Sequence, residues 1–395
     1  MKKYGLIGKS LSYSYSKLIH EYLIDKYKLD ASYDLIQVNH INRELLEKYD
    51  GCNITIPYKE EVLQYIDDDQ TGFNACNCLV NRESSLVGYN TDINGFDYLV
   101  NKVGAKDIKS IVVLGSGGSS KMVQYYFKDK KVIVVSRSSK KYNYENIHKI
   151  KADLLVNTTP VGMNEDKSIL DKKYLSNYKY IIDLNYNPLN SRIMLDSKEL
   201  SIPCINGLDM LIVQALVAFK RWNGIDYDDS LIEEIRSMIL LKTSDKIALI
   251  GMPLAGKSSM IYKYNGIDLD SEIFNTYNQE IEDLLKDNSF RKLESLELER
   301  LVKEGCSLLS LGGGAILNHR NIECIKDYLI VFLNTDLTIL KSRYQEGIRP
   351  LLKTINDLEV LYQKRIPMYC RYANIILDEK ECEDFLNKWE SKGDL

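Results

Sequence analysis

The chain has 395 residues, of which 27% are charged, and its formal net charge is −4. This length is too great for one typical hydrophobic core, so we expect two or three domains. The charge balance excludes the broad basic surface that nucleic-acid binding requires, and small molecules are therefore the expected partners.

The sequence gives no sign of a membrane segment or a structural metal. No apolar run approaches the roughly 20 residues that span a bilayer, and the N-terminal MKKYGLIGKS moves directly into a short strand pattern. We therefore expect a cytoplasmic protein with no membrane partner. The eight cysteines form no C-x-x-C pair and the four histidines have no zinc-type spacing, which predicts reduced core thiols. The oligomeric state is left open.

The first 95 residues alternate short strand-like runs with helical patterns, as in an open α/β sheet. The expected strands are Tyr4–Gly8, Tyr33–Val38 and Cys52–Ile56, and the expected helix is Ser16–Tyr27. From residue 109 the pattern changes to nearly continuous apolar runs, at 110–115, 131–136, 153–157 and 180–184. Such runs are typical of a parallel sheet covered on both faces, so we expect a Rossmann-like domain.

A helical stretch at 206–224 is followed by a second helix, whose start carries Ser230 and Glu233 at capping-box spacing. Its apolar residues share one face, which we expect to pack on the first sheet. The polar stretch 242–246 is the expected joint to the last domain. Beyond it, we expect five parallel strands and a small-kinase fold, with strands at Ile247–Ile250, Ile267–Leu269, Leu308–Leu311, Leu329–Leu333 and Ile375–Leu377.

Two glycine-rich loops, about 135 residues apart in this chain, each open a different α/β unit. The segment Val112–Ser120 has the strand-turn-helix pattern of a dinucleotide site. The segment Ala248–Ser259 fits the mononucleotide loop pattern G-x-x-x-x-G-K-[ST]. Two nucleotide chemistries on one polypeptide suggest two fused enzymes.

The first loop predicts a site for NADP(H). Its glycines allow the backbone to approach a pyrophosphate at the next helix N-terminus, although Ser120 replaces the usual third Gly or Ala. A NAD enzyme would carry an acidic residue after the second strand, but this chain has cations there, which favours a 2′-phosphate. The expected cofactor contacts are Gly115, Ser116, Gly117, Gly118, Ser119, Ser136, Arg137 and Lys141. A basic loop without a ligand is the competing reading, and it suits Lys140 better than Arg137.

The second loop predicts a site for ATP and Mg²⁺. Its backbone N–H groups surround a phosphate, Lys257 reaches the β and γ phosphates, and Ser258 binds magnesium. The expected nucleotide contacts are Leu254, Ala255, Gly256, Lys257, Ser258 and Ser259. The loop alone does not identify the phosphate acceptor.

Polar residues of the first domain form a third group of candidates. Hydroxyls at Ser14 and Ser16, two residues apart, can both donate to a carboxylate. Lys59, Asn90 and Asp92 add a cation, an amide and a carboxylate. An ammonium beside a carboxylate can polarise a ring ketone and donate the proton that its reduction requires. The competing reading is a surface salt bridge.

With these polar side chains and the first glycine-rich loop, residues 1–242 resemble the shikimate dehydrogenase family. The matching motifs, in order, are S-x-S at Ser14 and Ser16, N-[IV]-T-x-P-x-K at Asn53 to Lys59, A-x-N at Ala75 to Asn77, N-T-D at Asn90 to Asp92, the loop Gly115 to Ser119, and G-L-x-M-L-x-x-Q-A at Gly207 to Ala215. The resemblance makes Lys59 and Asp92 the catalytic pair, and Leu184 and Gly207 cofactor neighbours. It implies substrate contacts from Ser14, Ser16, Thr55, Asn77, Asp92, Tyr186 and Gln214. One departure is Cys78, where the family usually has Thr.

Residues 246–380 carry, in order, the motifs D-x-D at Asp268 and Asp270, F-R-x-x-E at Phe290 to Glu294, G-G-G at Gly312 to Gly314, R-P-L-L at Arg349 to Leu352 and R-x-P-x-Y at Arg365 to Tyr369. With these motifs, this part of the chain resembles shikimate kinase. By resemblance, Asp268 supports magnesium, Asp270 orients or deprotonates the acceptor hydroxyl, and Arg349 lies on a lid over ATP. Arg349 and Asp270 would join Lys257 in catalysis, while Arg291, Gly313 and Arg365 would hold shikimate.

Two features depart from the kinase pattern. Only ten residues separate Lys257 from Asp268, so the first helix is shorter than usual, and Leu254 replaces a common glycine. A competing hypothesis therefore treats the C-terminal half as a nucleotide-binding regulatory or scaffolding module of little kinase activity. Another reading is a quinate or shikimate dehydrogenase that uses NAD, against which Arg137 argues.

The sequence thus predicts an α/β protein with three domains and two activities. Residues 1–97 plus 208–242 form the dehydroshikimate-binding catalytic domain, 98–207 the Rossmann-like NADP domain, and 246–395 the P-loop kinase domain. The expected reactions are NADPH-dependent reduction of 3-dehydroshikimate to shikimate and MgATP-dependent phosphorylation of shikimate to shikimate 3-phosphate.

Overall fold

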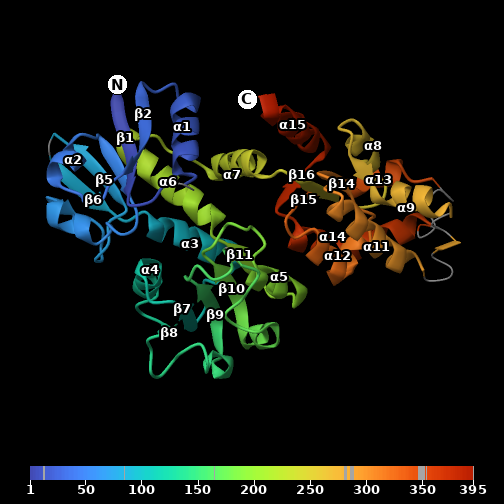
Figure 1. The fold of residues 1–395 in the computed structure, drawn as a ribbon, viewed down its shortest axis with the longest axis horizontal. Helices are drawn as coiled ribbons and strands as arrows, with labels where there is room; N and C mark the ends of the chain where they lie inside the picture. The colour runs from blue at the N-terminus through green and yellow to red at the C-terminus, as the bar shows by residue number, and fades with distance from the viewer. Residues whose placement is uncertain are drawn as a thin grey trace. The chain divides into compact units, whose positions relative to one another are not determined.

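A computed structural model describes residues 1–11, 14–83, 85–163, 165–279, 283–284, 289–345, 352 and 354–394. The chain divides into two compact units, Met1–Ile239 and Leu240–Leu395 (Figure 1). None of the helices in the described residues combines the length and apolar character that crossing a membrane requires.

The first unit begins with a mixed sheet. Over the described ranges it has six strands in the order β2-β1-β3-β5-β6-β4. Strands β1, β2 and β3 are parallel, whereas β5 runs antiparallel to both β3 and β6. The strands are β1 (Lys2–Gly8), β2 (Ala31–Gln37), β3 (Gly51–Ile54), β4 (Asp68–Asp69), β5 (Cys78–Arg82) and β6 (Ser85–Tyr89).

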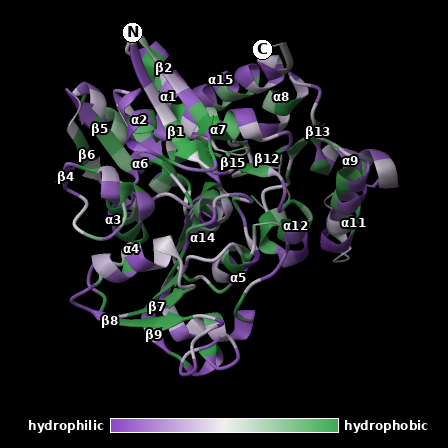
Figure 2. Ribbon diagram, turned by 60° about the vertical axis from the view of Figure 1, so that its left-hand side comes forward, coloured by the Kyte–Doolittle hydropathy of each residue, from purple (hydrophilic) through white to green (hydrophobic). Residues whose placement is uncertain are grey.

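A second sheet in the same unit is parallel throughout its described strands, in the order β11-β10-β9-β7-β8. Apolar residues run along β7, β8 and β9 (Figure 2), and β7 is almost wholly buried, as expected for a sheet covered on both faces. The strands are β7 (Ser110–Leu114), β8 (Lys131–Val135), β9 (Ala152–Asn157), β10 (Tyr178–Asp183) and β11 (Cys204–Asn206).

Two adjacent helices connect these sheets. The helices of the unit are α1 (Ser16–Lys26), α2 (Arg43–Glu47), α3 (Asp92–Val103), α4 (Gly118–Tyr126), α5 (Arg192–Glu199), α6 (Leu208–Asn223) and α7 (Asp229–Thr243), with short 3-10 turns at Glu61–Tyr65, Ile147–Lys149 and Lys172–Asn177. Helix α3 packs Phe96 and Leu99 into the core of the second sheet. Helix α6 packs Trp222 into the core of the first. Their contact fixes the two sheets relative to each other.

Helix α7 differs from the expectation at its start. It begins at Asp229, and the Asp228 carboxylate accepts hydrogen bonds from the Leu231 N–H (3.2 Å) and the Ser230 hydroxyl (2.6 Å). The prediction that Ser230 caps this helix is therefore wrong, because a carboxylate two residues earlier reaches the free N–H groups first. The Glu234 carboxylate of α7 lies 2.7 Å from Lys26 Nζ on α1.

The second unit contains a parallel sheet with the order β13-β14-β12-β15-β16 among its described residues. Every residue of β12, β14 and β15 is buried. The strands are β12 (Ile247–Ile250), β13 (Ile267–Asp268), β14 (Leu308–Ser310), β15 (Leu329–Leu333) and β16 (Ile375–Leu377). The helices are α8 (Lys257–Tyr262), α9 (Leu269–Tyr277), α11 (Phe290–Lys303), α12 (His319–Cys324), α13 (Leu337–Ser342), α14 (Ile355–Tyr372) and α15 (Glu379–Glu390), with 3-10 turns at Ala315–Leu317 and Ser391–Asp394.

The predicted α/β fold class is confirmed, and the predicted strands agree with the structure within two residues at each end. All eight cysteines lie in described residues and are free thiols. The prediction of core thiols holds for Cys52, Cys76, Cys78 and Cys382, which are buried, but is wrong for Cys370, which is exposed on α14.

Candidate active sites

The first unit contains a cavity of about 410 Å³ where the two sheets meet. Many of the residues predicted from separate motifs line it: Ser14, Ser16, Thr55, Lys59, Asn77, Asp92, Ser119, Leu184, Tyr186, Gly207 and Gln214. Ser119, Leu184 and Gly207 were expected beside the dinucleotide, and the others beside the substrate or at the centre of catalysis. The residues expected to contact the substrate and those expected to contact the dinucleotide therefore line the same cavity.

An ammonium and a carboxylate pair inside this cavity. Lys59 Nζ, in the loop after β3, lies 2.6 Å from Asp92 Oδ2, at the first residue of α3. Both side chains are partly buried, with 26% and 17% exposure. A helix N-terminus favours a negative charge, so the first residue of α3 is a suitable place for a carboxylate that pairs with a lysine. The cavity wall places this pair where it can meet a ligand.

Amide side chains fix the start of α3 and hold Asp92 in place. Asn90 Oδ1 accepts from the Asp92 N–H (3.1 Å), and Asn77 Oδ1 accepts from the Thr91 N–H (2.7 Å). Asn77 Nδ2 donates to Asp92 Oδ1 (2.9 Å) and lies 3.4 Å from Gln214 Oε1 on α6. Because these groups are buried, each hydrogen bond also avoids the cost of an unsatisfied polar atom.

The chain after β10 reaches the cavity because a buried carboxylate holds it. Asp183 accepts hydrogen bonds from Ser191 Oγ (2.6 Å) and Asn157 Nδ2 (2.9 Å), and burial raises its pKa to about 6. Leu184 and Tyr186 follow directly and line the cavity. Burial also raises the pKa of the Tyr186 hydroxyl, which favours its neutral, hydrogen-bonding form.

Several residues that line the cavity have no role predicted from the sequence. Asn53 on β3 lines the cavity and is 4% exposed, and Ser10, Met210 and Leu211 also line it. Asn53 opens the N-[IV]-T-x-P-x-K motif, so its position beside Thr55 was an available signal. Ser10 had no comparable motif.

The dinucleotide loop runs from the end of β7 into α4, as the sequence predicts. At Gly117 and Gly118 no atom lies within 4 Å of where a Cβ would be, so both backbones face open space at the helix N-terminus. This fits a pyrophosphate, since N–H groups at a helix N-terminus bind anions. After β8, Ser136 is buried, whereas Arg137 and Lys141 are exposed.

The phosphate loop of the second unit follows β12 and leads into α8. Lys257 is buried, and its Nζ donates to the carbonyls of Gly251 and Met252, both at 3.0 Å. The Lys257 ammonium therefore faces the inside of the loop, where a phosphate would sit. Ser258 Oγ donates to Asp268 Oδ2 at 2.6 Å. This hydroxyl and carboxylate pair has the hard oxygen atoms that Mg²⁺ prefers.

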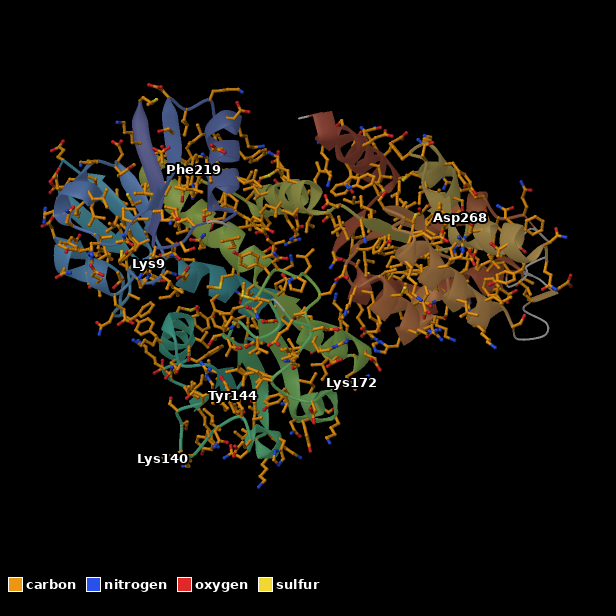
Figure 3. All side chains as sticks on the ribbon, in the orientation of Figure 1. Lys9, Lys140, Tyr144, Lys172, Phe219 and Asp268 are labelled. Carbon is orange, nitrogen blue, oxygen red and sulfur yellow. The ribbon has the colours of Figure 1, made fainter. Side chains whose placement is uncertain are left out.

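Asp268, which is labelled in Figure 3, accepts hydrogen bonds from several donors at once. Besides Ser258, its carboxylate accepts from Ser310 Oγ (2.8 Å) and the Ser271 N–H (3.0 Å), so it also caps α9. The short α8, six residues long, still brings Ser258 to Asp268. The departure in helix length thus leaves the predicted pair intact.

A second group of charges surrounds the loop Gly312–Gly314. A Cβ on Gly312 would lie 2.5 Å from Asp270 Oδ1, and one on Gly313 would lie 3.0 Å from Arg365 Nη1. Arg291 occupies the space beside Gly314. The structure therefore brings the predicted shikimate contacts together around one tight turn.

Glu294 is the residue of this group that received no predicted role. It is fully buried on α11, and both of its oxygens accept hydrogen bonds from Arg291 Nη1, at 2.7 and 2.8 Å. Burial raises its pKa to about 7, an effect that the Arg291 charge opposes. Arg349, predicted to lie on a lid, falls outside the described residues.

The comparisons with known proteins cover both units. A family model described as shikimate dehydrogenase substrate binding domain matches residues 6–79. The NADP(+) shikimate dehydrogenase of Clostridium beijerinckii is 34% identical over 265 residues, which cover 60% of this chain and 98% of that protein. The chain belongs to the shikimate dehydrogenase family.

Other shikimate dehydrogenases are similar to this chain in sequence and in structure. The Pyrococcus abyssi enzyme, also named for NADP(+), is 32% identical and is 97% covered. A chorismate mutase/shikimate 5-dehydrogenase fusion from Clostridium acetobutylicum superposes with a TM-score of 0.57 at 32% identity, over 60% of this chain and 96% of that one. The Thermus thermophilus shikimate 5-dehydrogenase, solved with NADP(H) and shikimate, gives 0.54 at 26% identity, over 59% and 98%.

The C-terminal part of the chain contains a shikimate kinase domain. The shikimate kinase family model matches residues 250–388. Both predicted resemblances are thereby confirmed, and the chain combines an oxidoreductase with a kinase. The NADP expected from the sequence agrees with the names of the relatives.

Proposed function

We propose that this chain is a bifunctional enzyme that reduces 3-dehydroshikimate to shikimate with NADPH and phosphorylates shikimate at its 3-hydroxyl with MgATP. The observation that carries the first reaction is the Lys59 and Asp92 pair in a cavity that also meets the dinucleotide loop at Ser119. The second reaction rests on Lys257, the Ser258 and Asp268 pair, and the arginines at Gly312–Gly314. The product of one site is then the substrate of the other.

In the first reaction, the bound nicotinamide cofactor supplies the hydride. The Lys59 ammonium donates the proton to the carbonyl oxygen and stabilises the charge that develops there. Asp92 holds the lysine by its 2.6 Å contact, and Asn77 holds Asp92 from the other side. Ser14 and Ser16 donate to the substrate carboxylate. Holding both ends of the ring acid orients its carbonyl toward Lys59.

In the second reaction, ATP held by the phosphate loop would supply the phosphoryl group, and a magnesium ion held by Ser258 and Asp268 would neutralise charge. Asp270 orients the acceptor hydroxyl, and Arg291 and Arg365 hold the shikimate carboxylate. Lys257 balances charge on the transferred group. Positioning and charge neutralisation dominate this chemistry, so a cluster of fixed cations is the expected design.

The direct test is a pair of single substitutions in the full chain. Lys59→Met should abolish NADP-linked shikimate oxidation and spare ATP-dependent phosphorylation, and Lys257→Met should do the reverse. Each variant is the folding control of the other. If the unaltered chain neither oxidises shikimate with NADP⁺ nor phosphorylates it with ATP, the proposal fails.

A second candidate for the C-terminal unit is a nucleotide-binding module with little catalysis. The observation that favours it is Leu254, which adopts φ 68° in the phosphate loop, a conformation that suits glycine. Calorimetric titration of the full chain with ATP, beside a phosphorylation assay, separates the two. ATP binding without shikimate phosphorylation would support the module.

A further inference from the structure

A buried tyrosine lies directly behind the substrate side of the dehydrogenase cavity. Tyr33 on β2 is 2% exposed, and its hydroxyl donates to Asn53 Oδ1 at 2.8 Å. Burial raises the pKa of Tyr33 well above its ordinary value, and a hydrogen bond with the Ser16 side chain opposes this effect. Tyr33 therefore stays neutral, and its hydroxyl holds Asn53, which lines the cavity.

The hydrogen bond from Tyr33 decides which end of Asn53 can serve a ligand. An amide has one acceptor and one donor end, and an anionic ring acid needs donors. Since the Tyr33 hydroxyl donates to Oδ1, the acceptor end is engaged with the protein. Asn53 Nδ2 donates one hydrogen bond to the Asn77 carbonyl oxygen at 3.4 Å, at the wall of the same cavity. The second N–H of the held amide is then the one that can serve a substrate oxygen.

The ring of Tyr33 is held as firmly as its hydroxyl. The His20 imidazole stacks on it at 4.3 Å between ring centroids, and Trp222 lies beside it at 6.3 Å. Burial lowers the pKa of His20 to about 3, so this neighbour is uncharged at neutral pH. A ring packed in this way has one rotamer, which gives the hydroxyl a single position.

We propose that Tyr33 is a positioning residue for the dehydrogenase reaction, which fixes the orientation of Asn53 toward the oxygens of the hydroxylated ring acid. This inference rests on the proposed dehydrogenase function. Tyr33 would touch no ligand itself and would act only through Asn53.

The neighbouring strand offers a matched control. Tyr4 pairs with Tyr33 in the β1 and β2 register, is 1% exposed and stacks on Trp222 at 4.8 Å. Its hydroxyl donates to Asn223 Oδ1 at 2.8 Å, at the end of α6, and Tyr4 does not line the cavity. Tyr4→Phe and Tyr33→Phe therefore each remove one buried hydroxyl from the same aromatic cluster, and both keep the ring.

The experiment is steady-state shikimate oxidation with NADP⁺ in the full chain. Tyr33→Phe should raise the KM for shikimate about tenfold with kcat nearly unchanged, because a binding interaction is lost in the ground and transition states alike. The KM for NADP⁺ should stay the same. Tyr4→Phe should change neither KM by more than about twofold, although both variants should lose similar thermal stability. Equal shikimate KM values for the two variants would overturn the inference.

A double-mutant cycle with Asn53→Ala provides the second test. If Tyr33 acts through Asn53, Tyr33→Phe should add little to the KM defect of Asn53→Ala. Fully additive defects would overturn the inference as well. An unaltered chain that oxidises no shikimate would instead refute the proposed function itself, and so the two failures are distinguishable.

Discussion

We propose that the choice between NADP and NAD depends on the side chain of Arg137. It is exposed after β8, in the position where NAD enzymes carry an acidic residue. Arg137→Ala should raise the KM for NADP⁺ about tenfold or more and leave the KM for NAD⁺ unchanged, because only the 2′-phosphate loses a partner. Initial rates with both cofactors measure this.

Lys140 provides the control for this prediction. It is exposed in the same loop and lies at the outer edge of the unit (Figure 3). Lys140→Ala should leave both cofactor KM values within about twofold, as expected for a screened surface charge. Higher activity with NAD⁺ than with NADP⁺ in the unaltered chain would contradict the assignment of Arg137.

Glu294 should make the kinase unit sensitive to pH. Burial raises its pKa from 4.5 in the unfolded chain to about 7, so the folded unit binds this proton more tightly. Its contribution to stability is therefore fully present below pH 4.5 and is lost as the pH rises toward 7. Glu294→Gln should flatten this part of the pH dependence of thermal unfolding. At pH 8 it should also raise the KM for shikimate in phosphorylation, since Arg291 loses an ionised partner.

Glu299→Gln on the same helix is the matched control for Glu294. Glu299 pairs with Arg320 near the surface, and this partner lowers the pKa of the carboxylate. Its neutralisation should change neither the stability between pH 5 and 7 nor the KM for shikimate, because an exposed ion pair contributes little. An unchanged pH profile in Glu294→Gln would show that Glu294 does not titrate in this range.

At the scale of elements, the close approach of α3 and α6 sets the geometry of the dehydrogenase cavity. Helix α3 begins with Asp92, and α6 carries Gln214. Gly95 of α3 allows the contact, since a Cβ there would lie 2.5 Å from the Met210 carbonyl oxygen. Gly95→Ala should push the helices apart, cost about 1–3 kcal/mol of stability as overpacking does, and lower kcat for shikimate oxidation. Thermal unfolding and the NADP-linked assay measure the two effects.

A substitution at Asn94, the exposed neighbour of Gly95 on α3, distinguishes the effect of helix packing from that of helix propensity. Asn94→Ala should be neutral or slightly stabilising, because alanine favours the helix and meets no second helix there. If Gly95→Ala behaves like Asn94→Ala, the distance between α3 and α6 is not limited by residue 95.

At the scale of the whole molecule, the first compact unit has two sheets and the second has one, and each unit should respond to its own nucleotide. We expect two calorimetric unfolding transitions. NADP⁺ at about 100 times its Kd should stabilise one of them by about 2.7 kcal/mol, and MgATP the other. Shikimate should raise both transitions if both units bind it, as the proposed function requires. Lys257→Met should remove the ATP effect alone, and a single transition raised by either nucleotide would contradict independent units.

Local patterns in the sequence predict most of the architecture and the resemblance to both families. The apolar runs that became β7, β12 and β15 are uninterrupted, so their burial follows from composition alone. Phosphate loops are equally local, because the glycines, the lysine and the following helix are consecutive. The predicted cap of α7 lies two residues too late, since Asp228 and Ser230 are both good caps and only the backbone geometry chooses between them.

The sequence by itself determined which chemistry each half can perform, because the reactive groups belong to contiguous motifs. Only the tertiary structure decided which groups act on one another. The contacts of Tyr33 with Asn53, of Asn77 with Gln214, and of Glu294 with the turn at Gly312–Gly314 join distant segments. Burial, orientation and pKa depend on those long-range neighbours, and no short pattern of residues encodes them.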